Sequence, residues 1–134
     1  MSNAKEVKED RKYTKDHEWA LSEGGEVLIG ITAFAVDQLG DVTLVGIDVK
    51  VGATLSAHQA FGTIESVKTL SDLFAPVSGT VKKLNATLES APERVNEDCW
   101  DEGWMLALQP DDPAAAESLL NPAAYREHIA SLEH

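Results

Sequence analysis

The residue with the clearest chemical potential is Lys68, in the stretch IESVKTLSDLFAPVSG that covers residues 64–79. An exposed lysine amine has a pKa of about 10.4, so it is protonated near neutral pH and is a poor nucleophile. Catalytic lysines are activated by burial or by a cationic neighbour. Lys68 instead has the acids Glu65 and Asp72 close in sequence, and both favour the charged amine. These residues argue against Schiff-base chemistry.

Two interpretations of Lys68 remain. A lone lysine at the tip of a hairpin is usually only solvated, but its long stem also suits a covalently attached cofactor. Acylation of the amine adds reach and removes the charge. Such a site needs an ordered, protruding tip that a modifying enzyme can recognise. Pro76 and Gly79, at fixed distances behind Lys68, are expected to make this tip rigid.

The rest of the chain offers no catalytic constellation. Cys99 is the only cysteine and lies among acids, which disfavour a thiolate and leave no partner for an internal disulfide. His17 and Glu18 are interpreted as a surface pair beside a buried Trp19, not as an acid–base dyad. Neither a nucleophile elbow nor a phosphate-binding glycine loop is present. No histidine has a metal-ligand spacing to another histidine or to cysteine: His17, His58, His128 and His134.

Length and charge restrict the class of protein. A chain of 134 residues is enough for one hydrophobic core. With 23 acids against 11 bases, the net charge of −12 argues against binding to nucleic acid or to an anionic membrane. No apolar run reaches the roughly 18 residues of a transmembrane helix. The acidity indicates either solubility alone or electrostatic steering toward basic protein partners.

We expect one domain over residues 13–134, preceded by a flexible tail over residues 1–12. Met1–Ala4 could be an expression remnant. The N-terminus lacks the apolar core of a signal peptide, and a single cysteine fits a reducing compartment. The expected location is therefore the bacterial cytoplasm, or the mitochondrial matrix after removal of a transit peptide.

The elements that must position Lys68 are mostly strands. Extended segments are expected over 13–20, 27–31, 42–47 and 103–109, with a short helix over 33–39 that Thr32 caps and Gly40 ends. Residues 59–67 and 72–85 form the pair of strands around Lys68. Pro76 indicates an edge or kinked strand, and Ser78-Gly79 predicts a tight turn.

The C-terminal segment, residues 112–132, is expected to be helical. Asp112-Pro113 and Asn121-Pro122 are both typical of helix starts. Tyr125, Ile129 and Leu132 then form one apolar stripe. Many short strands with glycine turns, followed by helices, predict a mainly β sandwich or partly open barrel with helices on the outside.

The stretch around Lys68 resembles the lipoyl-attachment signature of the glycine cleavage system H protein family. Its central tripeptide, Val67-Lys68-Thr69, differs from the Met-Lys-Met of biotin carriers and the Asp-Lys-Ala of other lipoyl domains. The resemblance covers most of the chain in four ordered blocks: Lys12–Trp19; Gly30–Thr32 with Ala35 and Leu39–Val42; Glu65–Lys68 with Ser71-Asp72 and Ala75–Gly79; and Val95-Asn96 with Gly103–Met105.

The resemblance implies a barrel-sandwich hybrid that carries lipoic acid in amide linkage to Lys68. Such a protein is a non-catalytic, monomeric shuttle. It would take the aminomethyl group from the pyridoxal-phosphate glycine decarboxylase to the aminomethyltransferase and be reoxidised by dihydrolipoamide dehydrogenase. A lipoate-attaching enzyme would recognise Glu65, Ser66 and Val67. Glu18 and Asp72 match acids that the family places near the loaded arm.

Three departures from the family pattern leave alternatives open. Phe34 stands where histidine is common, Ile47-Asp48 replaces the usual Leu-Pro, and Cys99-Trp100 replaces a common Pro-Tyr. An H-like protein that donates lipoyl groups to other enzymes, or that serves as a redox carrier for another pathway, is therefore a second hypothesis. The third is an unmodified interaction module in which Lys68 is only solvated.

Overall fold

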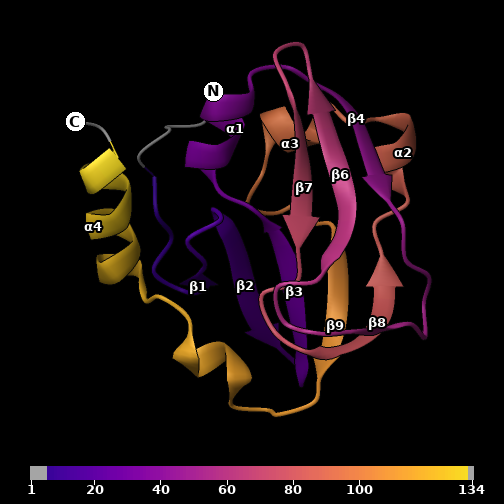
Figure 1. The fold of residues 1–134 in the computed structure, drawn as a ribbon, viewed down its shortest axis with the longest axis vertical. Coiled ribbons are helices and arrows are strands. Elements are labelled where there is room, and N and C mark those ends of the chain that lie inside the picture. Colours follow the sequence, from indigo (N-terminus) through magenta and orange to yellow (C-terminus); the bar gives the residue numbers. More distant parts are fainter. Residues whose placement is uncertain (1–5, 133–134) are drawn as a thin grey trace.

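The computed structural model describes residues 6–132 and contains two antiparallel β-sheets that pack face to face with helices outside them (Figure 1). The fold is mainly β, as the sequence predicts, and the sheets do not close into a barrel. One sheet has the strand order β1-β2-β3-β9-β8-β5 and the other β4-β6-β7. The strands are β1 (Lys12–Tyr13), β2 (Glu18–Glu23), β3 (Glu26–Ile31), β4 (Val42–Ile47), β5 (Thr54–Leu55), β6 (Ala60–Ser66), β7 (Leu70–Phe74), β8 (Gly79–Leu84) and β9 (Leu106–Pro110).

The helices are short and lie at the edges of the sandwich. They are α1 (Ala33–Leu39), α2 (Thr87–Ser90), α3 (Arg94–Glu97), the 3₁₀ helix η1 (Ala115–Ser118) and α4 (Pro122–Leu132). Within the described residues, none of these helices has the length and apolar character needed to span a membrane. Alternate residues of the strands form the core between the sheets, with Ile29, Phe61 and Leu108 among its fully buried members.

Helix α1 has the predicted boundaries, because its caps are local. The Thr32 hydroxyl accepts a hydrogen bond from the Ala35 N–H at 3.3 Å, which satisfies one of the free donors of the first turn. Gly40 ends the helix at φ 77°, a left-handed conformation that glycine adopts without steric cost. These caps fix where the chain enters β4.

The prediction of a single strand over residues 13–20 is wrong. The structure divides it into β1 and β2, with His17 at φ 68° in the turn between them. The Thr14 hydroxyl accepts hydrogen bonds from the N–H groups of Asp16 and Glu18, both at 3.2 Å. A threonine side chain that bonds nearby backbone in this way competes with extended structure. The turn places Glu18 at the start of β2.

The prediction of a tight turn at Ser78-Gly79 is also wrong. Gly79 is the first residue of β8 and pairs with Pro110, and a Cβ at this position would lie 2.4 Å from the Gln109 carbonyl oxygen. Glycine is therefore needed for a close approach of two strands. Pro76 lies in the crossing from β7 to β8, at the end of β7 opposite Lys68. Neither residue supports the tip directly.

The C-terminal segment is less helical than expected at its start. Asp112 accepts a hydrogen bond from the Ala114 N–H at 3.0 Å, but only the single 3₁₀ turn η1 follows. Helix α4 begins at the predicted Pro122. Tyr125 and Ile129 are buried, whereas Leu132 is 51% exposed, so the apolar stripe ends one turn early.

Residues 6–12, expected to belong to a flexible tail, pack against the domain. Val7 and Arg11 are buried, and the Tyr13 hydroxyl donates to the Lys8 carbonyl at 2.7 Å. Met1–Ala4, the possible expression remnant, lies outside the described residues. The start of the ordered domain is therefore at least as early as residue 6.

Candidate functional site

Lys68 lies at the tip of the β6–β7 hairpin, which projects from one end of the three-stranded sheet (Figure 1). Ser66 organises this tip. Its hydroxyl accepts hydrogen bonds from the N–H groups of Lys68 and Thr69, both at 3.2 Å, and its own N–H donates to the Thr69 carbonyl at 2.9 Å. The tip is thus an ordered turn with an exposed lysine, as the sequence predicts. Ser66 is itself buried, and its hydroxyl is already engaged in these hydrogen bonds.

The connection between α1 and β4 supports the hairpin from behind. The Val67 N–H donates to the Asp41 carbonyl at 3.1 Å. The Lys68 side chain lies beside Gly40, where a Cβ would be 3.3 Å from the Lys68 Cε. Glycine at this position therefore both allows the helix to end here and leaves room for the Lys68 side chain.

Asn96 of α3 fixes this connection, a role that the sequence did not indicate. Its side-chain amide donates to the Gly40 carbonyl at 2.9 Å, and its oxygen accepts from the Val42 N–H at 2.8 Å. The side chain thus bridges the two residues that flank Asp41. It indirectly positions the carbonyl that holds the lysine tip.

The two acids that neighbour Lys68 in sequence do not pair with it. Among residues 6–132, no ion pair joins the Lys68 amine to Glu65 or Asp72. Glu65 lies opposite Leu70 in the hairpin and is exposed, and Val67 is 68% exposed at the tip. Glu65, Val67 and Lys68 are therefore all accessible to a partner.

A pocket of about 300 Å³ lies beside the hairpin and brings Glu18 and Asp72 together. Most of its walls come from helix α1, from strand β7, and from the turn before β2 together with Glu18. Thr69, the residue after Lys68, lines it as well. The pocket therefore places two predicted site acids next to the tip of the hairpin.

Glu18 is buried, with 2% of its surface exposed, so the surface interpretation of this residue is wrong. One carboxyl oxygen, Oε2, accepts a hydrogen bond from the Phe74 N–H at 2.7 Å, and Oε1 is 3.4 Å from the Thr14 hydroxyl. Burial raises the pKa of the Glu18 carboxyl to about 8. The two hydrogen bonds act in the opposite direction and lower this pKa, but their effect is smaller than that of burial. Near neutral pH the protonated form is favoured.

His17 belongs to an aromatic cluster behind the pocket. Its Nδ1 is 2.9 Å from the Tyr125 hydroxyl, which is in turn 2.7 Å from the Thr32 hydroxyl. Phe34, the residue that departs from the family pattern, packs on the His17 ring at a centroid distance of 4.6 Å. Burial, together with the charge of His128, lowers the pKa of His17. Phe34 does not itself line the pocket, but it contacts His17, which does.

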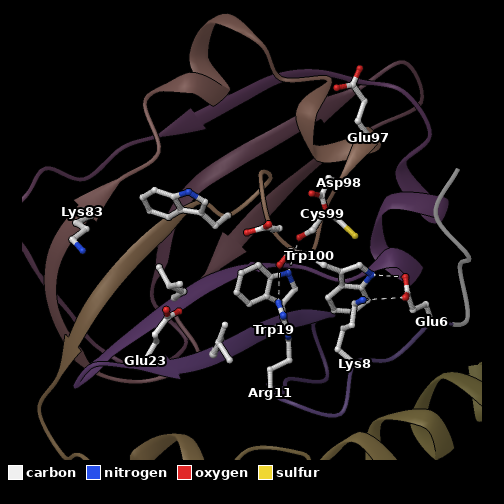
Figure 2. Close-up of a pocket in the computed structure, with 14 residues that line it drawn as sticks. Glu6, Lys8, Arg11, Trp19, Glu23, Lys83, Glu97, Asp98, Cys99 and Trp100 are labelled. Carbon is white, nitrogen blue, oxygen red and sulfur yellow. Dashed lines mark hydrogen bonds and ion pairs between the residues drawn. The ribbon is translucent and has the colours of Figure 1, made fainter.

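A larger groove, of about 820 Å³, lies against the six-stranded sheet and away from Lys68 (Figure 2). None of the predicted site residues lines it. Arg11 lies between two indoles, 4.6 Å from the Trp19 ring and 5.4 Å from the Trp100 ring. Its guanidinium donates to the Trp100 carbonyl at 2.8 Å (Figure 2). This arrangement attaches residues 6–12 to the domain.

The Cys99-Trp100 departure is part of the same packing. Cys99 is buried, and its carbonyl accepts a hydrogen bond from the Trp19 indole at 2.9 Å. Burial raises the pKa of the Cys99 thiol to about 12. Burial therefore favours the protonated thiol and shields it, which agrees with the expectation that the surroundings of Cys99 disfavour a thiolate.

Comparison with known proteins supports the resemblance. The family model described as "Glycine cleavage H-protein" matches residues 11–132. A glycine cleavage system H protein of Anaeromyxobacter sp. (strain K) is 44% identical over 128 residues, 96% of this chain and 99% of the relative. The Magnetococcus marinus protein of the same name is 52% identical over 119 residues, 89% of this chain and 84% of the relative.

The fold matches a solved member as well. The crystal structure of a glycine cleavage system H protein from Mycobacterium marinum superposes with a TM-score of 0.81 at 36% sequence identity. The match covers 96% of this chain and 100% of that protein. The barrel-sandwich fold inferred from the resemblance is thereby confirmed. On sequence, fold and the ordered lysine hairpin together, the chain belongs to the glycine cleavage H-protein family.

Proposed function

We propose that this protein is the lipoyl-bearing shuttle of the glycine cleavage system, with lipoic acid in amide linkage to Lys68. It would carry the aminomethyl group from the glycine decarboxylase subunit to the aminomethyltransferase subunit. The observation that carries the proposal is the exposed Lys68 on an ordered hairpin, in a chain that belongs to the glycine cleavage H-protein family and within the stretch that resembles the family's lipoyl-attachment signature. The chain itself acts as a non-catalytic carrier.

The surroundings of Lys68 fit a lipoyl group. The amine stands at an exposed tip, makes no ion pair with an acid among residues 6–132, and has a glycine beside its stem. When bound, the lipoyl dithiolane supplies the sulfur atoms that accept and release the aminomethyl group. The hairpin holds the attachment atom, Lys68 Nζ, where several partner enzymes can approach it.

The pocket beside the hairpin is a suitable place for the loaded end of the arm. It is next to the attachment tip, and Glu18 and Asp72 are among the residues that line it. A nearby amine cation favours the ionised form of a carboxyl. Glu18, whose burial raises its pKa to about 8, would lose its proton when such a cation enters and regain it when the cation leaves. Asp72, at the exposed edge, would attract the cation first.

The proposed partners are those of the glycine cleavage system. They are the pyridoxal-phosphate glycine decarboxylase, the aminomethyltransferase, dihydrolipoamide dehydrogenase and the lipoate-attaching enzyme. Each binds in turn to one monomer of the shuttle. The bacterial relatives support a location in the bacterial cytoplasm.

Intact mass spectrometry tests the attachment. After incubation with a lipoate ligase, lipoate and ATP, we expect wild-type protein to gain one lipoyl group and Lys68→Arg to gain none. Lys82→Arg, at another exposed lysine of a strand, is the matched control and should be modified like wild type. An unchanged wild-type mass, under conditions that modify another H protein, would exclude the carrier function.

One departure keeps a second function testable. Phe34 packs on His17, a residue that lines the pocket, and could change how the loaded arm is held. The alternative is an H-like protein that passes lipoyl groups to other enzymes. Glycine–bicarbonate exchange with glycine decarboxylase separates the two, because the shuttle must support exchange. A lipoylated protein that fails in this assay would favour the donor function.

A further inference from the structure

The pocket beside the lysine hairpin is lined by acids and by a single group that can become a cation. Among the described residues that line it, Asp16, Glu18 and Asp72 are acids, and His17 is the only side chain of the basic type. The other lining residues are apolar or uncharged. The protonation state of His17 therefore decides whether the pocket contains a positive charge of its own.

A chain of hydrogen bonds behind the pocket ends on the His17 ring. The Thr32 hydroxyl accepts from the Ala35 N–H at 3.3 Å and lies 2.7 Å from the Tyr125 hydroxyl, which lies 2.9 Å from His17 Nδ1. Thr32 and Tyr125 are both 0% exposed, so water cannot satisfy their hydroxyl groups. Each of the two protons therefore needs an acceptor within the protein.

Only one direction of this chain satisfies both protons. Within residues 6–132, the Tyr125 oxygen is the only acceptor that the Thr32 hydroxyl has. Thr32 therefore donates to Tyr125, and Tyr125 donates its own proton to His17 Nδ1. The reverse direction would leave the Thr32 proton buried without an acceptor, which is unfavourable. Nδ1 is thus unprotonated, and the imidazole of His17 is neutral with its proton on Nε2.

The side chains packed on the ring favour the same neutral state. His128 of α4 stacks on His17 at a centroid distance of 5.6 Å, and the apolar Phe34 of α1 packs on it at 4.6 Å. Burial of the ring, and the charge that His128 can carry, both lower the pKa of His17. The packing and the direction of the hydrogen bonds are independent of each other and agree.

The acids around His17 oppose this effect only weakly. Asp16, in the same turn, raises the pKa of His17, but by less than burial lowers it. Glu18, the next residue, favours its protonated form near neutral pH and then carries no charge that would stabilise an imidazolium. Asp72, on β7, is the remaining acid of the pocket, and no ion pair joins it to His17 among residues 6–132.

We propose that His17 is a specificity-determining residue of this pocket, held neutral by the Thr32–Tyr125 chain so that an incoming ammonium group is the only positive charge among the pocket acids. The inference rests on the proposed function, in which this ammonium group is the aminomethyl end of the loaded arm. A protonated His17 would repel that group and would compete with it for the same carboxylates. Tyr125 and Thr32 are positioning residues, since they act through His17.

Nitrogen NMR of the unmodified protein tests the state of His17 without any arm. We expect the ¹⁵N shifts of the ring to show one tautomer near neutral pH, with the proton on Nε2. Thr32→Ala removes the proton that orients Tyr125, so the Tyr125 hydroxyl can then accept from a protonated Nδ1 and the pKa of His17 should rise. Thr32→Ser keeps the hydroxyl and should restore the wild-type shifts. A wild-type ring that carries its proton on Nδ1, or on both nitrogens, would overturn the proposal.

A pair of variants at residue 17 tests the effect of charge on the loaded arm. Lipoylated protein is loaded by glycine decarboxylase and glycine and then separated, and loss of the aminomethyl group to water is followed by intact mass. His17→Lys should lose the group roughly tenfold faster than His17→Gln, because a fixed cation opposes the ammonium group in the pocket. Both side chains are unbranched at Cβ and meet the same left-handed backbone, φ 68°. Gln109→Lys, an exposed position of β9, adds the same charge elsewhere and should behave like wild type.

His128→Gln provides a test that leaves residue 17 unchanged, and thermal unfolding checks that each variant is folded. Removal of the stacked imidazole should raise the pKa of His17, so the loss of the aminomethyl group should accelerate at a higher pH than in wild type. Equal rates for His17→Lys and His17→Gln, or identical pH profiles for His128→Gln and wild type, would overturn the role of His17 alone. Wild-type protein that cannot be lipoylated or loaded would overturn the proposed function, and this role with it.

Discussion

At the scale of single residues, Lys68 and Glu18 have opposite environments. Lys68 is exposed on a hairpin tip, so its amine is accessible to a modifying enzyme. Glu18 is a carboxyl group withdrawn from water, with the Phe74 N–H as its main hydrogen-bond partner. The same acid would be a simple surface charge if β2 lay elsewhere. Its raised pKa is thus mainly a consequence of burial, to which the nearby charge of Asp16 adds.

The pKa of Glu18 predicts a pH-dependent stability. Its folded pKa of about 8 lies above the ordinary value of 4.5, so between these values the unfolded chain releases a proton that the folded chain retains. The stabilising contribution of the Glu18 carboxyl to the unfolding free energy is therefore fully present at low pH. It falls by roughly 1.4 kcal/mol per pH unit as the pH rises through this window. Glu18→Gln removes the titration.

Urea unfolding at several pH values, followed by tryptophan fluorescence, measures this effect. The stability of Glu18→Gln relative to wild type should increase from pH about 5 to about 8. The lowered pKa of His17 produces the opposite dependence, with stability lost as the pH falls below its ordinary value of 6.5. Because His17 is present in both proteins, its contribution cancels in the comparison. A difference that does not change with pH would contradict the prediction.

At the scale of elements, the lysine hairpin depends on parts of the chain that are distant in sequence. The tip is bonded to Asp41, and the flanking residues Gly40 and Val42 are held by Asn96. Helix α3, only one turn long, thereby helps to position the lysine hairpin. Asn96 is a positioning residue, since it acts through the α1–β4 connection.

Replacement of Asn96 by Asp tests this role. The carboxylate can still accept from the Val42 N–H but cannot donate to the Gly40 carbonyl, which loses its partner. We expect a loss of stability of about 1–3 kcal/mol and a lower lipoylation rate even at temperatures where the variant is folded. Asn85→Asp, which loses comparable amide bonds to the Glu102 and Trp104 carbonyls far from the hairpin, is the control. Equal rates for both folded variants would show that Asn96 is only structural.

The contact of β2 with β3 gives a second prediction for an element. Trp19 lies opposite Gly30, and a Cβ at residue 30 would be 2.4 Å from the Trp19 ring. The ring cannot move away freely because its indole N–H is bonded to Cys99 and Arg11 covers it. Gly30→Ala should therefore destabilise the protein by about 1–3 kcal/mol.

Thermal or urea unfolding measures the effect of Gly30→Ala, with Gly46→Ala as its control. Gly46 also lies in a strand, but a Cβ there would be at an ordinary contact distance of 3.5 Å from the Thr63 hydroxyl. The control should change stability by less than about 1 kcal/mol. Similar losses in both variants would indicate a general cost of alanine in these strands and not a clash with Trp19.

At the scale of the whole molecule, the net charge of −12 produces an electrostatic field that acts over a longer distance than any single contact. If this acidity attracts basic partners, it speeds their encounter, and added salt screens it. The contribution of charge to association can therefore be measured by varying the ionic strength.

The apparent KM of the lipoylated protein for glycine decarboxylase should rise steeply with added salt if its acidity steers association. Glycine–bicarbonate exchange over roughly 20–200 mM NaCl measures it. Sucrose at matched osmolality controls for general solvent effects. A flat dependence would leave the negative charge as a solubility feature only.

The sequence by itself determined the local structure around the site. Helix α1, with Thr32 and Gly40 at its ends, and the hairpin around Lys68 follow from caps, turns and strand patterns within a few residues. The family, and the proposal that Lys68 is the attachment residue, followed from the same short blocks. The strand expected over 13–20 failed because a single threonine side chain bonds the backbone and turns the chain.

Only the tertiary structure decided which residues are buried, and against what. Burial raises the pKa of Glu18, whose hydrogen-bond partner Phe74 is 56 residues away, and the position of the tip depends on Asn96, 56 residues after Gly40. Gly79 is required by the approach of β9, and the Arg11 guanidinium lies against the indoles of Trp19 and of the distant Trp100. Desolvation and close backbone contact arise between segments that meet only in the folded chain. Sequence patterns of a few residues therefore cannot predict which distant segments come into contact.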